Sequence, residues 1–169
     1  MAVDYSVIIP AYNEQKLLPA TLARLREAMA GVDLQGEVIV VDNNSTDRTA
    51  ELAARHGCRT VFEPVNQISR ARNKGAAAAQ GRYLIFLDAD TLLPPPLLAK
   101  ALANLRSGRY CGGGATVDFD QPLSALAQAF NSLWNWISVN YNLAAGSFFY
   151  CLQEGFAETG GFSRKVYAG

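Results

Sequence analysis

Two carboxylates separated by a single residue directly follow a short apolar run. The run is Leu84–Leu87, and the acids are Asp88 and Asp90. Such a run is typical of a strand buried on both faces. A buried carboxylate is costly unless it is hydrogen-bonded, paired with a cation or bound to a metal. The arrangement therefore indicates a ligand or metal site at the end of a strand. The alternative is a strand-end turn that caps a helix starting near Pro94.

The Asp-x-Asp spacing is weak evidence by itself, because short motifs recur by chance. A second copy, Asp118-Phe119-Asp120, occurs in the same chain. Acids at comparable positions elsewhere strengthen the first copy. Glu14 lies in the polar loop after the apolar run Ser6–Pro10, and Asp42 ends the run that begins at Glu37. Three apolar runs are thus each followed or ended by an acid.

The first half of the chain alternates strand patterns with helical patterns. The predicted strands are 6–10, 37–42, 58–62 and 83–87, and the predicted helices are 17–29, a segment capped by 43–47 that ends at His56-Gly57, and 66–80. This alternation predicts a parallel sheet joined by right-handed crossovers. We therefore expect one three-layer α/β/α domain with a mostly parallel sheet, over residues 1–169.

Sheets of this kind bind ligands outside the carboxyl ends of their strands, where the strand order reverses. With the order 3-2-1-4, that point lies between the first and the fourth strand. Glu14, Asp42, Asp88 and Asp90 would then gather around one crevice.

The second half of the chain is less regular. A helix should begin near Pro94 and end near Ser107, before a glycine-rich strand at 112–117. No charged residue occurs over 121–153, where Pro122 favours the start of an amphipathic helix. We expect that helix to pack on the sheet; a membrane-surface or lipid-acceptor face is the alternative. A strand at 147–152 and a short helix at 154–159 follow.

Composition narrows the class of protein. Half of the 169 residues are hydrophobic, and 15 basic side chains balance 15 acidic ones. A nucleic acid partner is not expected, because phosphate binding usually leaves a basic footprint. Cys58, Cys111 and Cys151 match no metal-ligand spacing and are expected to be reduced, buried thiols. The amino terminus lacks the pattern of a secretion signal. These features predict a cytoplasmic protein, with contact at the inner face of the membrane through 121–153 left open.

Several motifs, in order, resemble those of the family 2 glycosyltransferases of GT-A fold, which transfer a sugar from a nucleotide diphosphate. The resemblance covers nearly the whole chain. It is carried by Ser6–Glu14, Val40–Asp47, Arg70–Gly75, Leu87–Asp90, Ala145–Phe149 and Gly155–Phe162.

The resemblance implies a role for particular residues. The nucleotide sugar would be bound by Pro10, Ala11, Tyr12, Glu14, Asp42, Arg72, Asn73, Asp88 and Ala89. Asp42 would accept a hydrogen bond from the base, with helix capping as its alternative role. Asp88 would contact the ribose or metal-bound water, and Asp90 would ligate a Mg²⁺ or Mn²⁺ ion that bridges the two phosphates. The acceptor would be a carbohydrate or a lipid-linked molecule, attacked with inversion of the sugar.

The chain departs from the family pattern at its end. In the family, a Glu-Asp pair follows the Gly-Gly-Phe segment, and its Asp is the usual general base. Here that pair would fall after Gly169, so the domain is expected to be truncated and the fragment to bind its donor without efficient transfer. Glu154 and Glu158 are assigned to the short helix, with no catalytic role. The alternatives are a non-catalytic nucleotide-sugar-binding module and a nucleotidyltransferase.

Overall fold

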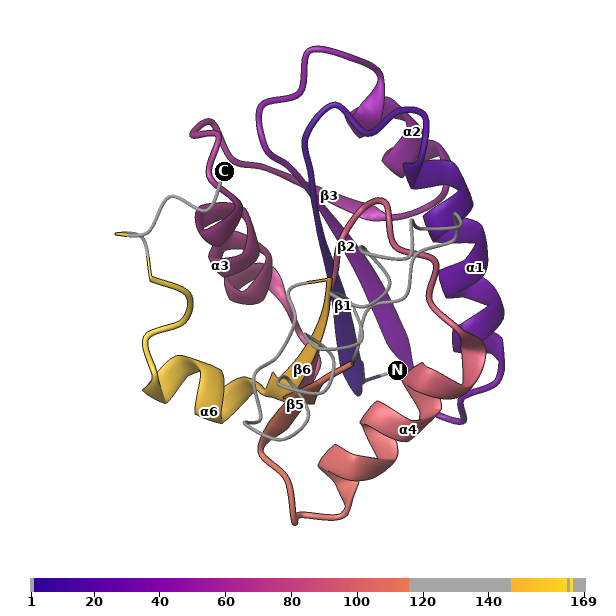
Figure 1. Cartoon of the computed structure of the whole chain (residues 1–169), viewed down its shortest axis with the longest axis vertical. Helices are drawn as coiled ribbons and strands as arrows, with labels where there is room; N and C mark the ends of the chain where they lie inside the picture. Colours follow the sequence, from indigo (N-terminus) through magenta and orange to yellow (C-terminus); the bar gives the residue numbers. More distant parts are fainter. Residues whose placement is uncertain (1, 116–146, 164, 166–169) are drawn as a thin grey trace, which may run out of the picture.

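The computed structural model describes residues 2–115, 147–163 and 165. They form a six-stranded sheet in the order β3-β2-β1-β4-β6-β5 (Figure 1). The strands are β1 (Tyr5–Ala11), β2 (Gly36–Asp42), β3 (Arg59–Phe62), β4 (Tyr83–Leu87), β5 (Gly112–Gly114) and β6 (Phe148–Leu152). The first four strands pair in parallel, whereas β6 is antiparallel to β4 and to β5. The predicted mostly parallel sheet and the order 3-2-1-4 are confirmed.

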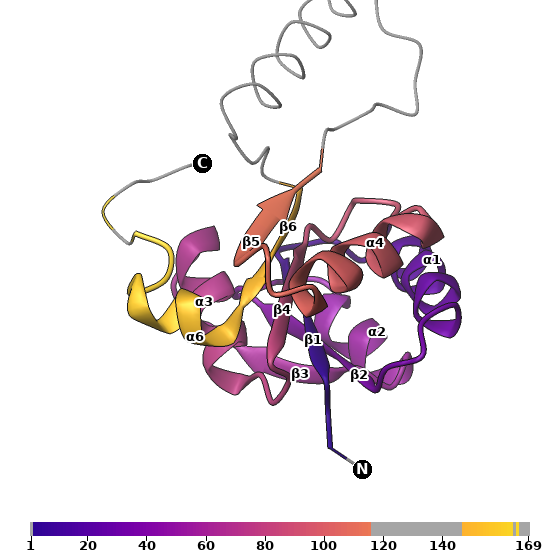
Figure 2. The same cartoon turned by 90° about the horizontal axis from the view of Figure 1, so that it is seen from below.

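Helices cover both faces of this sheet. They are α1 (Leu18–Ala30), α2 (Thr49–Arg55), α3 (Ile68–Ala78), α4 (Pro95–Arg106) and α6 (Gln153–Glu158). Helices α1, α2 and α4 lie on one face and α3 and α6 on the other (Figure 2). Their apolar residues belong to two separate cores, one on each face. The molecule is therefore a three-layer α/β/α structure, as expected. None of the helices in the described parts of the chain is long and apolar enough to cross a membrane.

The two central strands are buried on both faces. Every residue of β1 is buried, and its side chains alternate between the two hydrophobic cores, with Val7 and Ile9 in one and Ile8 in the other. In β4, the residues Leu84–Leu87 are all buried. Continuous apolar runs therefore lie where a helix covers each side of the sheet, as parallel sheets require.

Pro10 does not end the first strand, contrary to the prediction. β1 continues to Ala11, and Pro10 lies opposite Val41 of β2. The pairing of β1 with β4 ends earlier, at Ile8 and Phe86. Pro10 therefore stands beyond the part of β1 that has neighbours on both sides, and a missing N–H is tolerated there as on an edge strand.

Other boundaries differ by a few residues. Gln67 and Ala79 have extended backbone conformations and delimit α3, so this helix is shorter than the predicted 66–80. β5 is confined to Gly112–Gly114. Cys58 is half-buried and Cys151 buried, but Cys111 is exposed, so the prediction of three buried thiols is wrong for Cys111. The second Asp-x-Asp motif and the helix expected after Pro122 lie outside the described residues.

Candidate functional site

The ends of three neighbouring strands bring the predicted acids to one edge of the sheet. The parallel register sets Asp42, the last residue of β2, beside Ala11, the last residue of β1. β4 lies on the other side of β1 and leads directly into Asp88. Since parallel strands end at the same edge, the loops after β1, β2 and β4 share one surface. Glu14, Asp42, Asp88 and Asp90 all belong to these strand ends and loops.

Asn43 organises the loop after β2. Its buried side chain donates hydrogen bonds to the carbonyl oxygens of Glu63 and Val65 and accepts one from the N–H of Gln67 at 3.0 Å. The loop between β3 and α3 is thereby attached to the end of β2. Oδ1 of Asp42 accepts a hydrogen bond from the backbone N–H of Ser45, with 3.0 Å between the two atoms. This contact closes a turn and does not cap α2, so the capping alternative for Asp42 is not supported.

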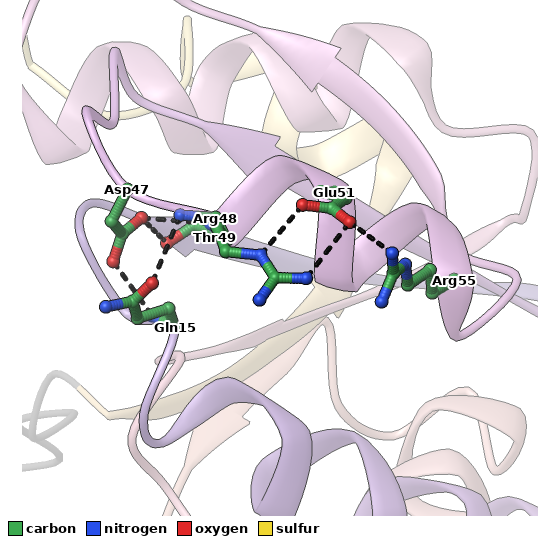
Figure 3. Close-up of polar contacts among 6 residues, drawn as sticks. All are labelled: Gln15, Asp47, Arg48, Thr49, Glu51 and Arg55. Carbon is green, nitrogen blue, oxygen red and sulfur yellow. Dashed lines mark hydrogen bonds and ion pairs between the residues drawn. The ribbon is translucent and has the colours of Figure 1, made fainter.

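The loop after β1 is attached to the loop after β2 through its backbone. The N–H groups of Asn13, Glu14 and Gln15 donate to the side chains of Ser45, Thr49 and Asp47, at 3.0, 2.8 and 3.1 Å. Figure 3 shows the carboxylate of Asp47 hydrogen-bonded to both Gln15 and Thr49. Because each donor is a backbone group, the path of the β1–α1 loop is set by polar side chains of its neighbour.

The predicted caps on α2 are only partly correct. The N-cap residue is Arg48, which makes no hydrogen bond of its own to cap the helix. Asp47, one position earlier, accepts the N–H of Thr49 at 2.9 Å. Arg48 instead pairs with Glu51, which also contacts Arg55 on the exposed side of the helix (Figure 3).

A second group of acids lies at the β1 and β4 ends with little compensation. Burial, followed by the charges of Asp90 and Asp47, raises the pKa of Glu14. Burial also raises the pKa of Asp88, against the lowering effect of Arg72 and with a further rise from Asp90. Asp90 itself is exposed. Asp90 is thus close enough to repel both Glu14 and Asp88, and the three carboxylates gather negative charge at the edge of the sheet.

Neither aspartate of the Asp88-Ala89-Asp90 motif caps the next helix. α4 begins at Pro95 with Pro94 at the N-cap, and no side chain makes a capping bond. The motif is held from its backbone instead. The N–H of Asp88 donates to the carbonyl of Ser147 at 3.0 Å, and the hydroxyl of Thr21 donates to the buried carbonyl of Ala89 at 2.8 Å. The two carboxylates are thus presented by a fixed backbone.

This donor set suits a hard divalent cation. Within the described residues, no cluster of three or more His, Cys, Asp or Glu side chains has the geometry of a complete metal site. Mg²⁺ typically takes only one or two protein carboxylates and completes its shell with water and substrate phosphates. A cation would also offset the burial, and the repulsion from neighbouring acids, that raise the pKa values of Glu14 and Asp88. Asp90 and Asp88 therefore fit the predicted metal.

Arg72 and Asn73 of α3 have different environments. Arg72 donates to Oδ1 of Asp88 at 2.7 Å, and the two side chains are only 12% and 26% exposed. The amide of Asn73 makes two hydrogen bonds with the backbone of Phe162, each 2.9 Å long. Arg72 thus lies beside Asp88, and its predicted contact with the nucleotide stays a prediction. Asn73 contacts the segment after α6, so the structure gives it a supporting position; its predicted contact with the nucleotide is not tested.

The remaining predicted residues are divided between the surface and the interior. Tyr12 is 48% exposed, whereas Pro10, Ala11 and Ala89 are buried. Pro10 and Ala11 shape the end of β1, and Tyr12 is the side chain there that a ligand can reach. Asn43, Glu63 and Phe162 were missed as supporting residues. Their contacts join residues 20 to 89 positions apart, and no local sequence pattern reports such pairs.

Comparison with known proteins shows which proteins this chain resembles. The sequence model of a protein family, described as glycosyl transferase family 2, matches residues 6–160 of this chain. An uncharacterized glycosyltransferase of Mycobacterium tuberculosis is 40% identical over 103 residues, which are 61% of this chain and 44% of the relative. A dolichol-phosphate mannosyltransferase of Saccharomyces cerevisiae is 32% identical over 135 residues, 73% of this chain and 51% of the relative. The chain spans from about a third to half of the length of such relatives.

Solved structures share the fold. A mannosyltransferase from Pyrobaculum calidifontis, in complex with GDP-Man and Mn²⁺, superposes with a TM-score of 0.72 at 23% identity, over 98% of this chain and 49% of that one. Glucosyl-3-phosphoglycerate synthase from Mycobacterium tuberculosis, in complex with Mn²⁺ and UDP, superposes with a TM-score of 0.68 at 21% identity. The match covers 90% of this chain and 57% of that one. At these identities the likeness shows the fold alone, which is GT-A.

Proposed function

Because the chain belongs to glycosyl transferase family 2, we propose that this edge of the sheet binds a nucleotide-diphospho-sugar together with Mg²⁺ or Mn²⁺ and presents the sugar to an acceptor hydroxyl. One observation carries the proposal. Glu14, Asp88 and Asp90 form an under-compensated negative cluster beside loops that are already fixed in place. That combination is what a cation and the phosphates it bridges would complete.

The two sides of the edge take different parts of the donor. The loop after β1, with the exposed ring of Tyr12, and Asp42 on β2 hold the base and the ribose. Asp88 and Asp90 lie at the end of β4, where Asp90 would ligate the metal at the diphosphate and Asp88 would contact the ribose or metal-bound water. Arg72 holds Oδ1 of Asp88 and adds a positive charge beside the phosphates.

The chemistry follows from where negative charge grows. As the bond to the sugar breaks, charge develops on the departing nucleoside diphosphate, and a bound divalent cation supplies Lewis-acid stabilisation for that charge. The side chains of this protein orient the donor: Asp42 accepts a hydrogen bond from the base, Arg72 lines the nucleotide pocket, and Asp88 contacts the ribose or metal-bound water. Inversion at the sugar by a single displacement is the stereochemistry we propose.

The acceptor belongs to the proposal as well. Among the relatives are a dolichol-phosphate mannosyltransferase and an undecaprenyl-phosphate 4-deoxy-4-formamido-L-arabinose transferase. Lipid-linked acceptors are therefore the first class to test, ahead of free carbohydrates. Glu154 and Glu158, both exposed on α6, are assigned no role as base.

Ligand-induced stabilisation tests the donor site directly. UDP-, GDP- and dTDP-sugars are added with Mn²⁺ or with EDTA, and the melting temperature is measured. A donor at 100 times its dissociation constant should stabilise the fold by about 2.7 kcal/mol, and EDTA should remove most of that gain. Asp90→Asn should abolish the Mn²⁺-dependent part.

Asp33→Asn is the matched control, because Asp33 is an exposed aspartate between α1 and β2, at the other end of the strands. It should respond to donor and Mn²⁺ as the unmodified chain does. Equal affinity of the Asp90→Asn variant and the unmodified chain in Mn²⁺ would contradict the metal role and favour a metal-independent binding module. Release of pyrophosphate from a nucleoside triphosphate and a sugar phosphate would favour a nucleotidyltransferase instead.

A further inference from the structure

Phe162 is attached to α3 through its backbone. Its N–H donates to Oδ1 of Asn73, and its carbonyl accepts from Nδ2 of the same side chain. The preceding Gly160 and Gly161 both have φ of +75°, a conformation that side chains rarely adopt. A Cβ on Gly161 would also lie 2.6 Å from Oδ1 of Asn73. The turn after α6 is therefore built to bring Phe162 against α3.

The ring of Phe162 lies between an aromatic cluster and a cation. It packs edge-on against Phe86 of β4, with centroids 5.1 Å apart, and against Phe156 of α6 at 5.5 Å. The guanidinium of Arg72 stands over the same ring, 5.3 Å from its centroid. That guanidinium also donates to Oδ1 of Asp88. Arg72 is thus held by the aromatic ring and by the carboxylate.

We propose that Phe162 is a positioning residue for the donor site: through Arg72 it fixes the side chain of Asp88. A long arginine side chain loses considerable freedom when its head group is held in one place. The cation–π contact on Phe162 contributes to that immobilisation before any ligand arrives. Without the ring, Arg72 can leave Asp88, and the carboxylate loses the partner that orients it.

The consequence is a link between two parts of the chain that are distant in sequence. The segment that follows α6 and the acids that follow β4 share one guanidinium. Whatever shifts Gly160–Phe162 should then alter Asp88, and a ligand bound at Asp88 should in turn stabilise that segment, because such coupling is reciprocal. This consequence for donor binding rests on the proposed function; the placement of Arg72 by Phe162 does not.

The placement is tested without ligand, by NMR of the arginine side chains in the 169-residue protein. Protons of Arg72 should show the upfield shift caused by the nearby ring. Phe162→Leu should remove that shift, and Phe162→Tyr, which keeps a ring, should restore it. Phe156→Leu is the matched control, because Phe156 belongs to the same cluster, whereas the guanidinium of Arg72 stands over the ring of Phe162. An unchanged Arg72 signal in Phe162→Leu would overturn the proposal.

The effect on the site is tested by calorimetric titration of GDP and UDP in Mn²⁺. We expect Phe162→Leu to weaken binding about fivefold or more, the scale of a lost partly buried cation–π contact, while Phe162→Tyr and Phe156→Leu stay within about twofold. Melting temperatures should fall by similar amounts in both leucine variants. Equal loss of affinity in the two would show a general packing effect and overturn the positioning role. Failure of the unmodified chain to bind either nucleotide would instead contradict the proposed function, and the NMR shifts alone would then decide the placement.

Discussion

The pKa values of the acids are shifted in opposite directions on the two sides of the sheet edge. On the side of β2 and β3, burial alone would raise the pKa of Glu63, but the N–H of Val65 and the side chains of Arg70 and Lys74 hold that pKa below its ordinary value. The pKa of Asp47 is lowered too, because hydrogen bonds from Thr49 and Gln15 outweigh the effect of burial. We call Asn43, Asp47 and Glu63 the compensated side.

On the side of β4 the balance is reversed. The pKa values of Glu14 and Asp88 are raised, by burial first and then by neighbouring acids. Arg72 lowers the pKa of Asp88 but does not bring it back to its ordinary value. We call Glu14, Asp88 and Asp90 the uncompensated side.

The difference distinguishes residues that organise the loops from residues that we propose to bind a ligand. The compensated side contains the counter-charges and donors that it needs, so its loops are organised before a ligand binds. On the uncompensated side Arg72 offsets burial only in part, and a cation with phosphates would provide the remaining positive charge. Sites that are costly to the free protein are commonly those that a ligand completes. The comparison thus predicts that substitutions on the two sides change stability in opposite directions.

Asn43→Asp should have the largest effect on stability. The substitution keeps the size of the side chain but replaces its amide donor with a carboxylate, which faces the carbonyls of Glu63 and Val65. Leaving buried carbonyls without donors and burying a charge should lower the free energy of unfolding by about 3 kcal/mol. Urea unfolding measures the change. Asn44→Asp is the control, since Asn44 is exposed with φ of 66°, which Asp also tolerates. A similar loss in both variants would contradict the role of Asn43.

The contacts of Asn43 also show where the sequence is informative and where it is not. The apolar runs through Ile8, Val40 and Ile85 predicted buried parallel strands, and parallel strands necessarily end at one edge. That argument was enough to bring Glu14, Asp42 and Asp88 together. The argument uses only the spacing of apolar residues and the parallel direction of the strands, and both can be inferred from short stretches of sequence.

The supporting contacts depend on the exact course of loops. Asn43 contacts Glu63 and Val65, and Asn73 contacts Phe162 across 89 positions, through backbone groups that every residue carries. An asparagine in such a loop predicts a cap or a turn equally well. The family resemblance assigned Asn73 to the ligand, and that contact stays a prediction; the structure adds the hydrogen bonds of its amide to Phe162, which the sequence did not indicate. Pro10 was misplaced because the strand pairing that tolerates it is not visible in one chain segment.

Glu63→Gln should have the next largest effect, and it should depend on pH. A lowered pKa stabilises the fold above the unfolded pKa, and this stability is lost as pH falls through the folded pKa. Removing the charge leaves Arg70 and Lys74 without their buried partner. We expect a loss of about 1 to 2 kcal/mol near neutral pH, which shrinks on acidification because protonated Glu63 loses the same contacts. Urea unfolding at several pH values measures it.

Glu27→Gln is the control for that comparison, since the ion pair between Arg24 and Glu27 lies on the surface of α1. It should change stability by less than about 0.5 kcal/mol. A loss in Glu63→Gln that stays constant down to acidic pH would mean that the charge of Glu63 does not stabilise the loop, and the compensated side would lose one of its members.

Glu14→Gln should give the smallest effect, with the opposite sign. Folding raises the pKa of Glu14, so the unmodified chain is favoured below the unfolded pKa and loses stability as pH rises through the folded pKa. Glutamine removes that loss. Because Glu14 is partly exposed and solvent screens its charge, we expect the variant to gain only a few tenths of a kcal/mol near neutral pH, and nothing near about pH 4. Urea unfolding at both pH values measures the gain. A variant less stable than the unmodified chain at neutral pH would show that Glu14 is compensated after all, because only a carboxylate with satisfied partners stabilises the fold when ionised.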